Sequence, residues 1–104
     1  PPFHRNVASE FLGLISGQYI GKADTFVPGS ASLHNCMSGH GPDTESFERG
    51  SSSDLKPHYI DNTMVFLFET QLPILPTRFA LETDLLERDY YQHWMGLKKY
   101  WSGR

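Results

Sequence analysis

The sequence contains two histidines and one glutamate whose side chains suit a metal ion: His4, Glu10 and His40. Two imidazoles and one carboxylate occupy one face of an octahedral Fe(II) ion and leave other positions free for O2 and a substrate. A zinc ion accepts the same residue types, so the residues alone narrow the metal without deciding between iron and zinc. The prediction of a metal centre requires that the three side chains converge in the fold.

The side chains of His4 and Glu10 can meet only if the segment between them is not a single straight element. In one straight strand the two residues would lie roughly 20 Å apart, and in one helix they would point about 120° apart. We therefore expect the chain to reverse direction at residues 6–9, where asparagine and serine are residue types that turns accommodate.

His40 comes from far along the chain and stands between Gly39 and Gly41. Small neighbours allow the backbone to approach a crowded site closely. The residues alone also permit a simpler interpretation, in which His4 and His40 are ordinary loop histidines and Glu10 is a solvated strand end.

The composition restricts the class of protein. The 104 residues carry a net charge of −3 with acidic and basic residues interspersed, which disfavours nucleic acid and anionic membranes as partners. Cys36 is the only cysteine, so an intrachain disulfide is excluded and a reducing compartment is favoured. We see no secretory segment and no apolar run long enough to span a bilayer, and therefore expect a cytoplasmic protein. The length fits one domain or a piece of a larger one, and the opening Pro-Pro is typical of a cut or processed end.

Seven prolines and nine glycines divide the sequence into short segments. We predict strands at residues 10–15, 18–21, 31–34, 63–69 and 77–81, with residues 18–21 pairing back on the first strand across a Ser-Gly turn. Pro73 and Pro76 confine the intervening segment to an edge or an irregular path. Residues 43–49 are predicted to form a short surface helix that ends near Gly50.

The C-terminal part predicts an α-helix. Asp84 and Glu87 have the spacing of a capping box, and large apolar residues follow at helical intervals: Leu86, Tyr90, Trp94, Leu97 and Trp101. We interpret this stripe as a packing face, with Gly96 as a weak point. The predicted fold class is mainly β with a C-terminal α-helix, and short strands joined by Gly/Pro turns fit a jelly roll or small barrel, architectures that include the cupins.

Several stretches of the sequence form a recognisable set of motifs: Pro-Pro-Phe-His-Arg-Asn, Ser-Glu-Phe-Leu-Gly-Leu-Ile, Pro-Gly-Ser-Ala-Ser-Leu-His, Gly-His-Gly-Pro-Asp, residues 62–69, and the set Tyr90, Trp94, Leu97 and Lys98. Together they closely resemble the C-terminal end of the homogentisate 1,2-dioxygenases, iron enzymes that open an aromatic ring. The similarity runs nearly the whole chain with the same intervals between motifs. It implies that residues 1–104 are the C-terminal portion of a cupin-like iron-binding domain, a partial jelly roll whose upstream strands and N-terminal domain are absent from this chain.

The resemblance also assigns roles to individual residues. In this family the His-Arg-Asn histidine, the Ser-Glu-Phe glutamate and the His-Gly-Pro histidine hold the iron, which implies Fe(2+) as the cofactor and His4, Glu10 and His40 as its ligands. It further implies that Tyr19 and His40 contact the substrate and that His34 lies in the second sphere or on the substrate side. The family's acid–base histidine lies upstream of this segment.

The activity implied by the resemblance is the cleavage of homogentisate with O2 to maleylacetoacetate, a step of tyrosine and phenylalanine catabolism. The implied partners are homogentisate, O2, the remainder of the same subunit, and further copies, since the family forms hexamers. The isolated chain is expected to be an inactive fragment with open strand edges. A rival interpretation is a non-oxygenase metal-binding cupin, such as an isomerase or a sugar-binding module.

One departure from the family pattern lies next to His4. The family has two aromatic residues between the Pro-Pro pair and the histidine, whereas here only Phe3 stands there, which would reshape one wall of the pocket. Among the remaining candidates, we interpret His58 and His93 as structural or solvated and Cys36 as a small buried residue.

Overall fold

The structure, a computed structural model, describes residues 2–22 and 24–103. Its elements in chain order are β1 (Ser9–Ser16), β2 (Ala31–His34), α1 (Thr44–Ser52), β3 (Met64–Thr70), α2 (Arg78–Glu82) and the 3-10 helix η1 (Tyr90–Trp94). The predicted mainly β class is confirmed, because the chain forms a three-stranded antiparallel sheet with few helices, compatible with a partial cupin-like fold. In the described part of the chain, every helix is too short or too polar to cross a membrane.

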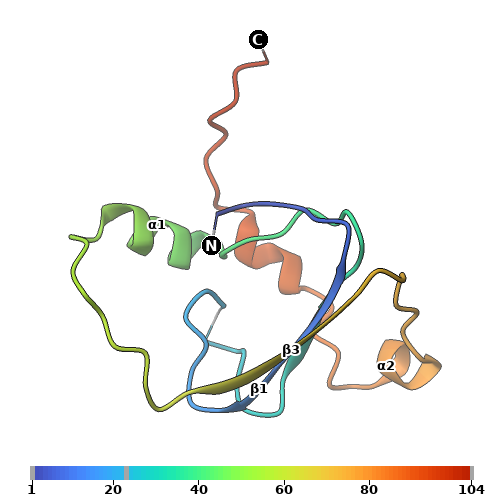
Figure 1. Ribbon diagram of the computed structural model, residues 1–104. Helices are drawn as coiled ribbons and strands as arrows, with labels where there is room; N and C mark the ends of the chain where they lie inside the picture. The colour runs from blue at the N-terminus through green and yellow to red at the C-terminus, as the bar shows by residue number, and fades with distance from the viewer. Residues whose placement is uncertain (1, 23, 104) are drawn as a thin grey trace.

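β1 is the central strand of the sheet and pairs antiparallel with β2 on one side and β3 on the other. This register places Glu10 opposite His34 on β2 and opposite Glu69 on β3. Figure 1 shows α1 and η1 on one side of the sheet, where they contact each other, and the C-terminal segment running away from the body. The sheet therefore fixes Glu10, while the loops around it supply the other site residues.

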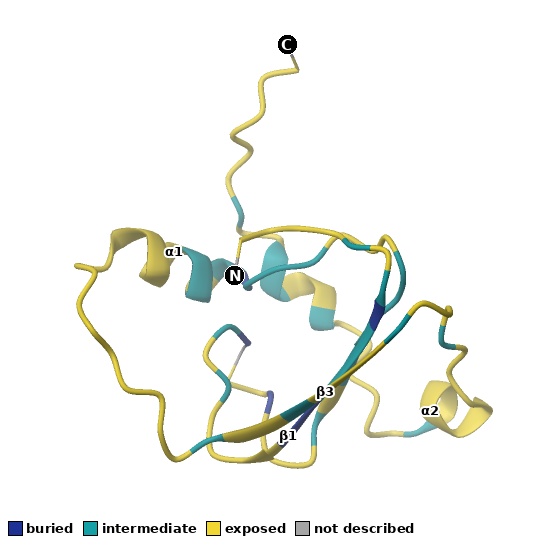
Figure 2. Cartoon of the chain, in the orientation of Figure 1, coloured by how far each residue is buried: buried dark blue, intermediate teal, exposed yellow. Residues whose placement is uncertain are grey.

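The core of the chain is small. Leu14 and Phe26 are the large apolar side chains that are buried among the described residues, with exposed fractions of 2% and 7%. Figure 2 shows that the segment between α1 and β3, the outer part of β3 and α2 are exposed along almost their whole length. Much of the apolar surface of the sheet thus remains open to solvent in this chain.

Three of the five predicted strands are confirmed, because their bounds lie within one residue of those of β1, β2 and β3. Differences of this size are usual at the ends of elements. The predicted hairpin strand at residues 18–21 is wrong. Both edges of β1 are already taken by β2 and β3, and the loop after Val27 also bonds to β1, with Gly29 N donating to Leu14 O at 2.8 Å. Among the described residues, β1 therefore offers no free edge to residues 18–21, which contain one end of an isolated bridge between Ile20 and Lys22.

The predicted strand at residues 77–81 is also wrong, because this segment forms helix α2. Thr77 caps the helix by accepting a hydrogen bond from Ala80 N at 3.2 Å, and Arg78 forms an ion pair with Glu82 one turn later at 2.9 Å. None of the described strands pairs with this segment, and Phe79 is 75% exposed. Local capping decided the conformation here, in the absence of a partner strand.

The long C-terminal α-helix is replaced by a turn and the 3-10 helix η1. Glu87 does not complete a capping box; its carboxylate instead lies 3.2 Å from His93 Nε2. Tyr90, Trp94 and Leu97 are half-buried, as a packing stripe requires, but Trp101 is 70% exposed. The 3-10 helix η1 is five residues long and has 3.0 residues per turn, so residues spaced for the 3.6-residue period of an α-helix do not stay on one face.

Helix α1 begins where the sequence predicts and ends later. Asp43 is its N-cap, and its Oδ1 accepts a hydrogen bond from Ser46 N at 2.7 Å. The helix ends at Ser52, two residues after the predicted end near Gly50, and the hydroxyl of Ser52 donates to Glu48 O at 2.8 Å. Serine hydroxyls that bond to the preceding turn satisfy carbonyls at the end of a helix.

Replacing Gly17 with alanine is expected to destabilise the fold strongly. Gly17 has a φ of 77°, and a Cβ there would lie 1.9 Å from Asn62 O, on the segment that leads into β3. The left-handed conformation alone costs about 1–3 kcal/mol for other residues, and the overlap with backbone adds to this. Urea unfolding measures the effect. Gly50→Ala is the matched control, since a Cβ at Gly50 meets open space; equal midpoints for the two variants would contradict the prediction.

Candidate metal centre

His4, Glu10 and His40 converge in the fold. Each offers one ligand atom, and these atoms all lie within 4.8 Å of one another. Glu10 lies on β1, His4 precedes that strand, and His40 follows β2. The backbones of His4 and His40 are joined by two hydrogen bonds of 2.9 Å, one in each direction. The side chains are therefore brought together by a backbone bridge as well as by the sheet.

The chain reverses between His4 and Glu10, where the sequence required it. Residues 7 and 8 form a bend, and Asn6 Oδ1 accepts a hydrogen bond from Ala8 N at 2.8 Å. This is an Asx turn, in which the side chain substitutes for a backbone carbonyl. The turn allows His4, which precedes the strand, to face Glu10, which lies on it.

Both histidines are held in the tautomer that a metal ion needs. His4 Nδ1 lies 2.7 Å from Pro2 O, and His40 Nδ1 lies 2.9 Å from Ser38 O. A carbonyl oxygen only accepts hydrogen bonds, so Nδ1 carries the proton in each neutral ring and Nε2 keeps its lone pair. Histidine ligands of metals commonly donate their second nitrogen to a backbone carbonyl in this way.

The environment of His40 Nε2 fits a cation. This atom is buried and has no hydrogen-bond partner among the described residues, yet Glu10 Oε2 lies 3.4 Å away. An unprotonated ring nitrogen and a carboxylate oxygen both present lone pairs, and such a pair is unfavourable unless a positive group lies between them. Imidazole nitrogens with one carboxylate suit Fe(II), Zn(II) and related ions, so the residues present fit the ion that the sequence implies.

Asn6 also orients Glu10. Its Nδ2 donates a hydrogen bond to Glu10 Oε1, which leaves Oε2 for the side that faces His40. One asparagine thus forms the turn and holds the carboxylate.

Replacing Asn6 with alanine is expected to lower the affinity for Fe(II) by about 10- to 100-fold, the usual effect of losing an outer partner of a metal ligand. Competition with a chromogenic chelator under anaerobic conditions measures it. Asn6→Ser separates the two roles, because serine still accepts from Ala8 N but is too short to reach Glu10. If the serine variant binds Fe(II) like the unchanged protein, the hydrogen bond to Glu10 has no role in binding.

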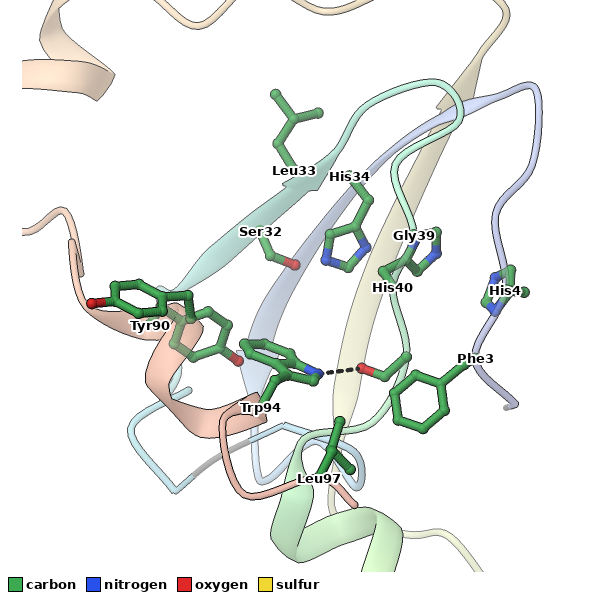
Figure 3. Close-up of a pocket in the computed structure, with 12 residues that line it drawn as sticks. Phe3, His4, Ser32, Leu33, His34, Gly39, His40, Tyr90, Trp94 and Leu97 are labelled. Carbon is green, nitrogen blue, oxygen red and sulfur yellow. Dashed lines mark hydrogen bonds between the residues drawn. The ribbon is translucent and has the colours of Figure 1, made fainter. Parts of the chain in front are cut away.

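A cavity of about 690 Å³ opens beside the three side chains. Figure 3 shows His4, His34 and His40 along one side of it and Tyr90, Trp94 and Phe3 around the other. Trp94 Nε1 donates to Gly41 O at 3.4 Å and so connects η1 to the loop that carries His40. The volume lies in the range of small-molecule sites, and the aromatic wall suits an aromatic ligand.

Comparison with protein-family models matches residues 1–101 to the family described as homogentisate 1,2-dioxygenase C-terminal. The chain belongs to this family. Membership of this family implies that the chain is part of a dioxygenase-related protein. The suspected resemblance over nearly the whole chain is thereby confirmed. Two of the three converging residues, His4 and His40, line the large cavity; we call His4, Glu10 and His40 the triad.

The resemblance implies that Tyr19 contacts the substrate and that His34 lies in the second sphere or on the substrate side. Both residues lie beside the triad. Tyr19 lines a second cavity of about 70 Å³ together with His4, Glu10 and His40. His34 lines both cavities, and its ring stacks on that of His40 with centroids 4.3 Å apart. Their roles toward a substrate stay predictions.

The other sequence candidates lie elsewhere. His58 is exposed in the segment before β3, and His93 contacts Glu87 at 3.2 Å. Cys36, predicted to be a small buried residue, is only half-buried. Its sulfur lies 3.1 Å from the hydroxyl of Ser9, which is fully buried.

Burial controls the protonation of two groups in the cavity wall. It lowers the pKa of His34 to about 4, with the nearby Lys22 charge as the second cause, so that this imidazole is neutral at pH 7. Burial also raises the pKa of Tyr90 to about 12, helped by the carboxylates of Asp43 and Glu87, so its hydroxyl keeps its proton. The cavity wall therefore presents neutral hydrogen-bonding groups.

Lys22 is a residue of this region that the sequence did not indicate. It is only 7% exposed and lines the small cavity with the triad. A single lysine in a short loop carries no motif, so only the folded chain reveals its position.

Proposed function

We propose that this chain supplies the metal centre of a Fe(II)-dependent homogentisate 1,2-dioxygenase, with His4, Glu10 and His40 as the ligands. The observation that carries the proposal is the convergence of these three side chains, with the tautomers of both histidines fixed by backbone carbonyls. The family of the chain supports the substrate and reaction type. Two imidazoles and one carboxylate on one face are the donor set of non-haem iron oxygenases.

When bound, Fe(2+) would supply Lewis acidity toward a ring hydroxyl of homogentisate and redox chemistry toward O2. Glu10 offsets part of the charge of the ion, while His4 and His40 contribute neutral nitrogen donors. Because these imidazoles must be unprotonated to bind, iron affinity falls in acid. The product of the proposed reaction is maleylacetoacetate, as part of tyrosine and phenylalanine catabolism.

The chain's own residues would bind and orient the substrate. Trp94, Tyr90 and Phe3 line the large cavity and offer apolar surface against which an aromatic ring packs and from which water is excluded. Tyr19 offers a hydroxyl that orients the substrate by donating a hydrogen bond from the small cavity. His40 both binds the ion and lines the cavity, and the group that moves the hydroxyl proton is proposed to come from a histidine upstream of this chain.

We further propose that residues 1–104 are the C-terminal portion of the cupin-like domain and pack against the remainder of the same subunit. Leu67 and Phe68 are neighbours on β3, so their side chains point to opposite faces of the sheet. They are 47% and 66% exposed, which means that both faces of the sheet lack cover at this place. β2 and β3 are both edge strands, and open edges of this kind require cover in a stable protein. Assembly of complete subunits into a hexamer, as in the family, belongs to the same proposal.

Metal analysis and oxygen uptake test the proposed function. The protein at its native length, prepared anaerobically with Fe(II), is expected to hold one iron per subunit and to consume O2 when homogentisate is added. The same protein stripped of iron is the control, and the 104-residue chain alone is expected to be inactive. Stoichiometric iron without oxidation of homogentisate would contradict the proposal and favour a non-oxygenase cupin.

A further inference from the structure

Lys22 occupies an unusual position for a lysine. Its Nζ lies 5.7–5.9 Å from the ring centroids of Phe26, Tyr90 and Trp94, and the residue is only 7% exposed. Burial lowers the pKa of Lys22, and the carboxylates of Asp43 and Glu10 oppose that shift. The faces of the three aromatic rings attract an ammonium group, so these rings and the two carboxylates favour the charged form of Lys22 at this place.

The one hydrogen bond of the Lys22 side chain among the described residues goes to His34 Nε2, at 3.3 Å. An ammonium group has three donors and no acceptor, so Nε2 of the imidazole must be the acceptor. In a neutral ring the proton then resides on Nδ1. The described residues offer His34 Nδ1 no hydrogen-bond partner, and His34 lines the large cavity (Figure 3).

We propose that Lys22 is a positioning residue of this site: it fixes His34 with the proton on Nδ1, so that His34 donates a hydrogen bond to an oxygen of the substrate in the large cavity. This inference rests on the proposed function, because the substrate oxygens are those of a hydroxylated aromatic acid. The His34 ring stacks on the ring of His40 with centroids 4.3 Å apart, so His34 lies beside a residue proposed to bind the iron.

A purely structural role for Lys22 makes a different prediction. If the lysine only fills space between Phe26, Tyr90 and Trp94, a methionine of similar length preserves the packing and leaves His34 unchanged. If Lys22 acts through His34, the methionine variant loses the donor to Nε2, and the imidazole becomes free to exchange tautomers.

The test uses the native-length protein with Lys22→Met, and Lys98→Met at an exposed lysine as the matched control. The 15N chemical shifts of histidine-labelled protein report which ring nitrogen of His34 carries the proton, with His34→Leu identifying the signals. We expect Nδ1 alone to be protonated in the unchanged protein and a mixture in the Lys22 variant. The second measurement is the dissociation constant of homogentisate without O2, expected to rise about 10-fold with the loss of an oriented hydrogen bond.

A double-mutant cycle with His34→Leu completes the test. Since Lys22 is proposed to act through His34, the double variant is expected to bind homogentisate no more weakly than His34→Leu alone. Additive effects, or a protonated Nε2 in the unchanged protein, would overturn the inference even if the protein oxidises homogentisate. Shifted His34 signals in a protein that does not bind homogentisate would support the contact between Lys22 and His34 and contradict the proposed function. If Lys22→Met does not fold, Lys22→Leu carries the same measurements, because leucine also offers no donor to His34 Nε2.

Discussion

Replacing Glu10 with glutamine is expected to lower the affinity for Fe(II) by at least about 100-fold, beyond the effect of losing an outer partner. Glutamine keeps the size of the side chain but removes the negative charge that offsets the divalent ion. The Asn6 amide that donates to Glu10 Oε1 retains an acceptor in the glutamine side chain, so the turn at residues 6–9 is preserved. The chelator competition described for Asn6 measures the loss, with oxygen uptake as a second readout.

Glu69→Gln is the matched control for this prediction. Glu69 lies directly opposite Glu10 across the β1–β3 pair but is exposed and is not one of the three converging residues. The two substitutions change the charge of adjacent strands equally, so a difference between them isolates the metal centre from the general electrostatics of the sheet. Unchanged iron occupancy in Glu10→Gln would remove Glu10 from the ligand set.

Replacing His40 with alanine is expected to abolish stoichiometric iron binding and, with it, homogentisate-dependent oxygen uptake. The change removes one proposed ligand and a wall of both cavities. The fold is expected to persist, because the two bonds that join His40 to His4 are formed by backbone atoms, which alanine retains. Metal analysis of the purified variant measures the loss, and urea unfolding checks the fold.

His58→Ala provides the control, since His58 is an exposed histidine outside the converging set. Iron content is expected to be unchanged in this variant. If His40→Ala retained iron as His58→Ala does, the metal centre would have to use a different set of residues.

The strands could be predicted from the sequence because their pattern is local. Residues 63–69 are rich in β-branched and aromatic side chains, and Glu10 to Ile15 form an apolar run bounded by Ser-Gly; both patterns favour strands. The predicted helix at residues 43–49 begins at Asp43, and in the structure Asp43 is the N-cap of α1, a role that the sequence did not predict. These elements agree in the structure with their intrinsic preferences.

The errors arose where the outcome depended on a partner. Residues 77–81 have strand-like composition but no neighbouring strand in this chain, so a threonine cap and an ion pair made them helical. Residues 18–21 do not pair with β1, because β2 and β3 occupy both of its edges. Glu87 contacts His93 and Thr25, both of which lie outside the capping box that the sequence suggested.

The sequence by itself determined the residue types of the site, the need for a reversal between His4 and Glu10, and, through its motifs, the family. Only the tertiary structure decided that the three side chains converge, that backbone carbonyls fix the tautomers of His4 and His40, and that Lys22 lies against His34. The physical reason is that ligand types and strand periodicity are local properties of a chain. Hydrogen bonds to carbonyls and the burial of a charge depend on segments that are distant in sequence, and their positions are set only when the sheet and its loops pack together.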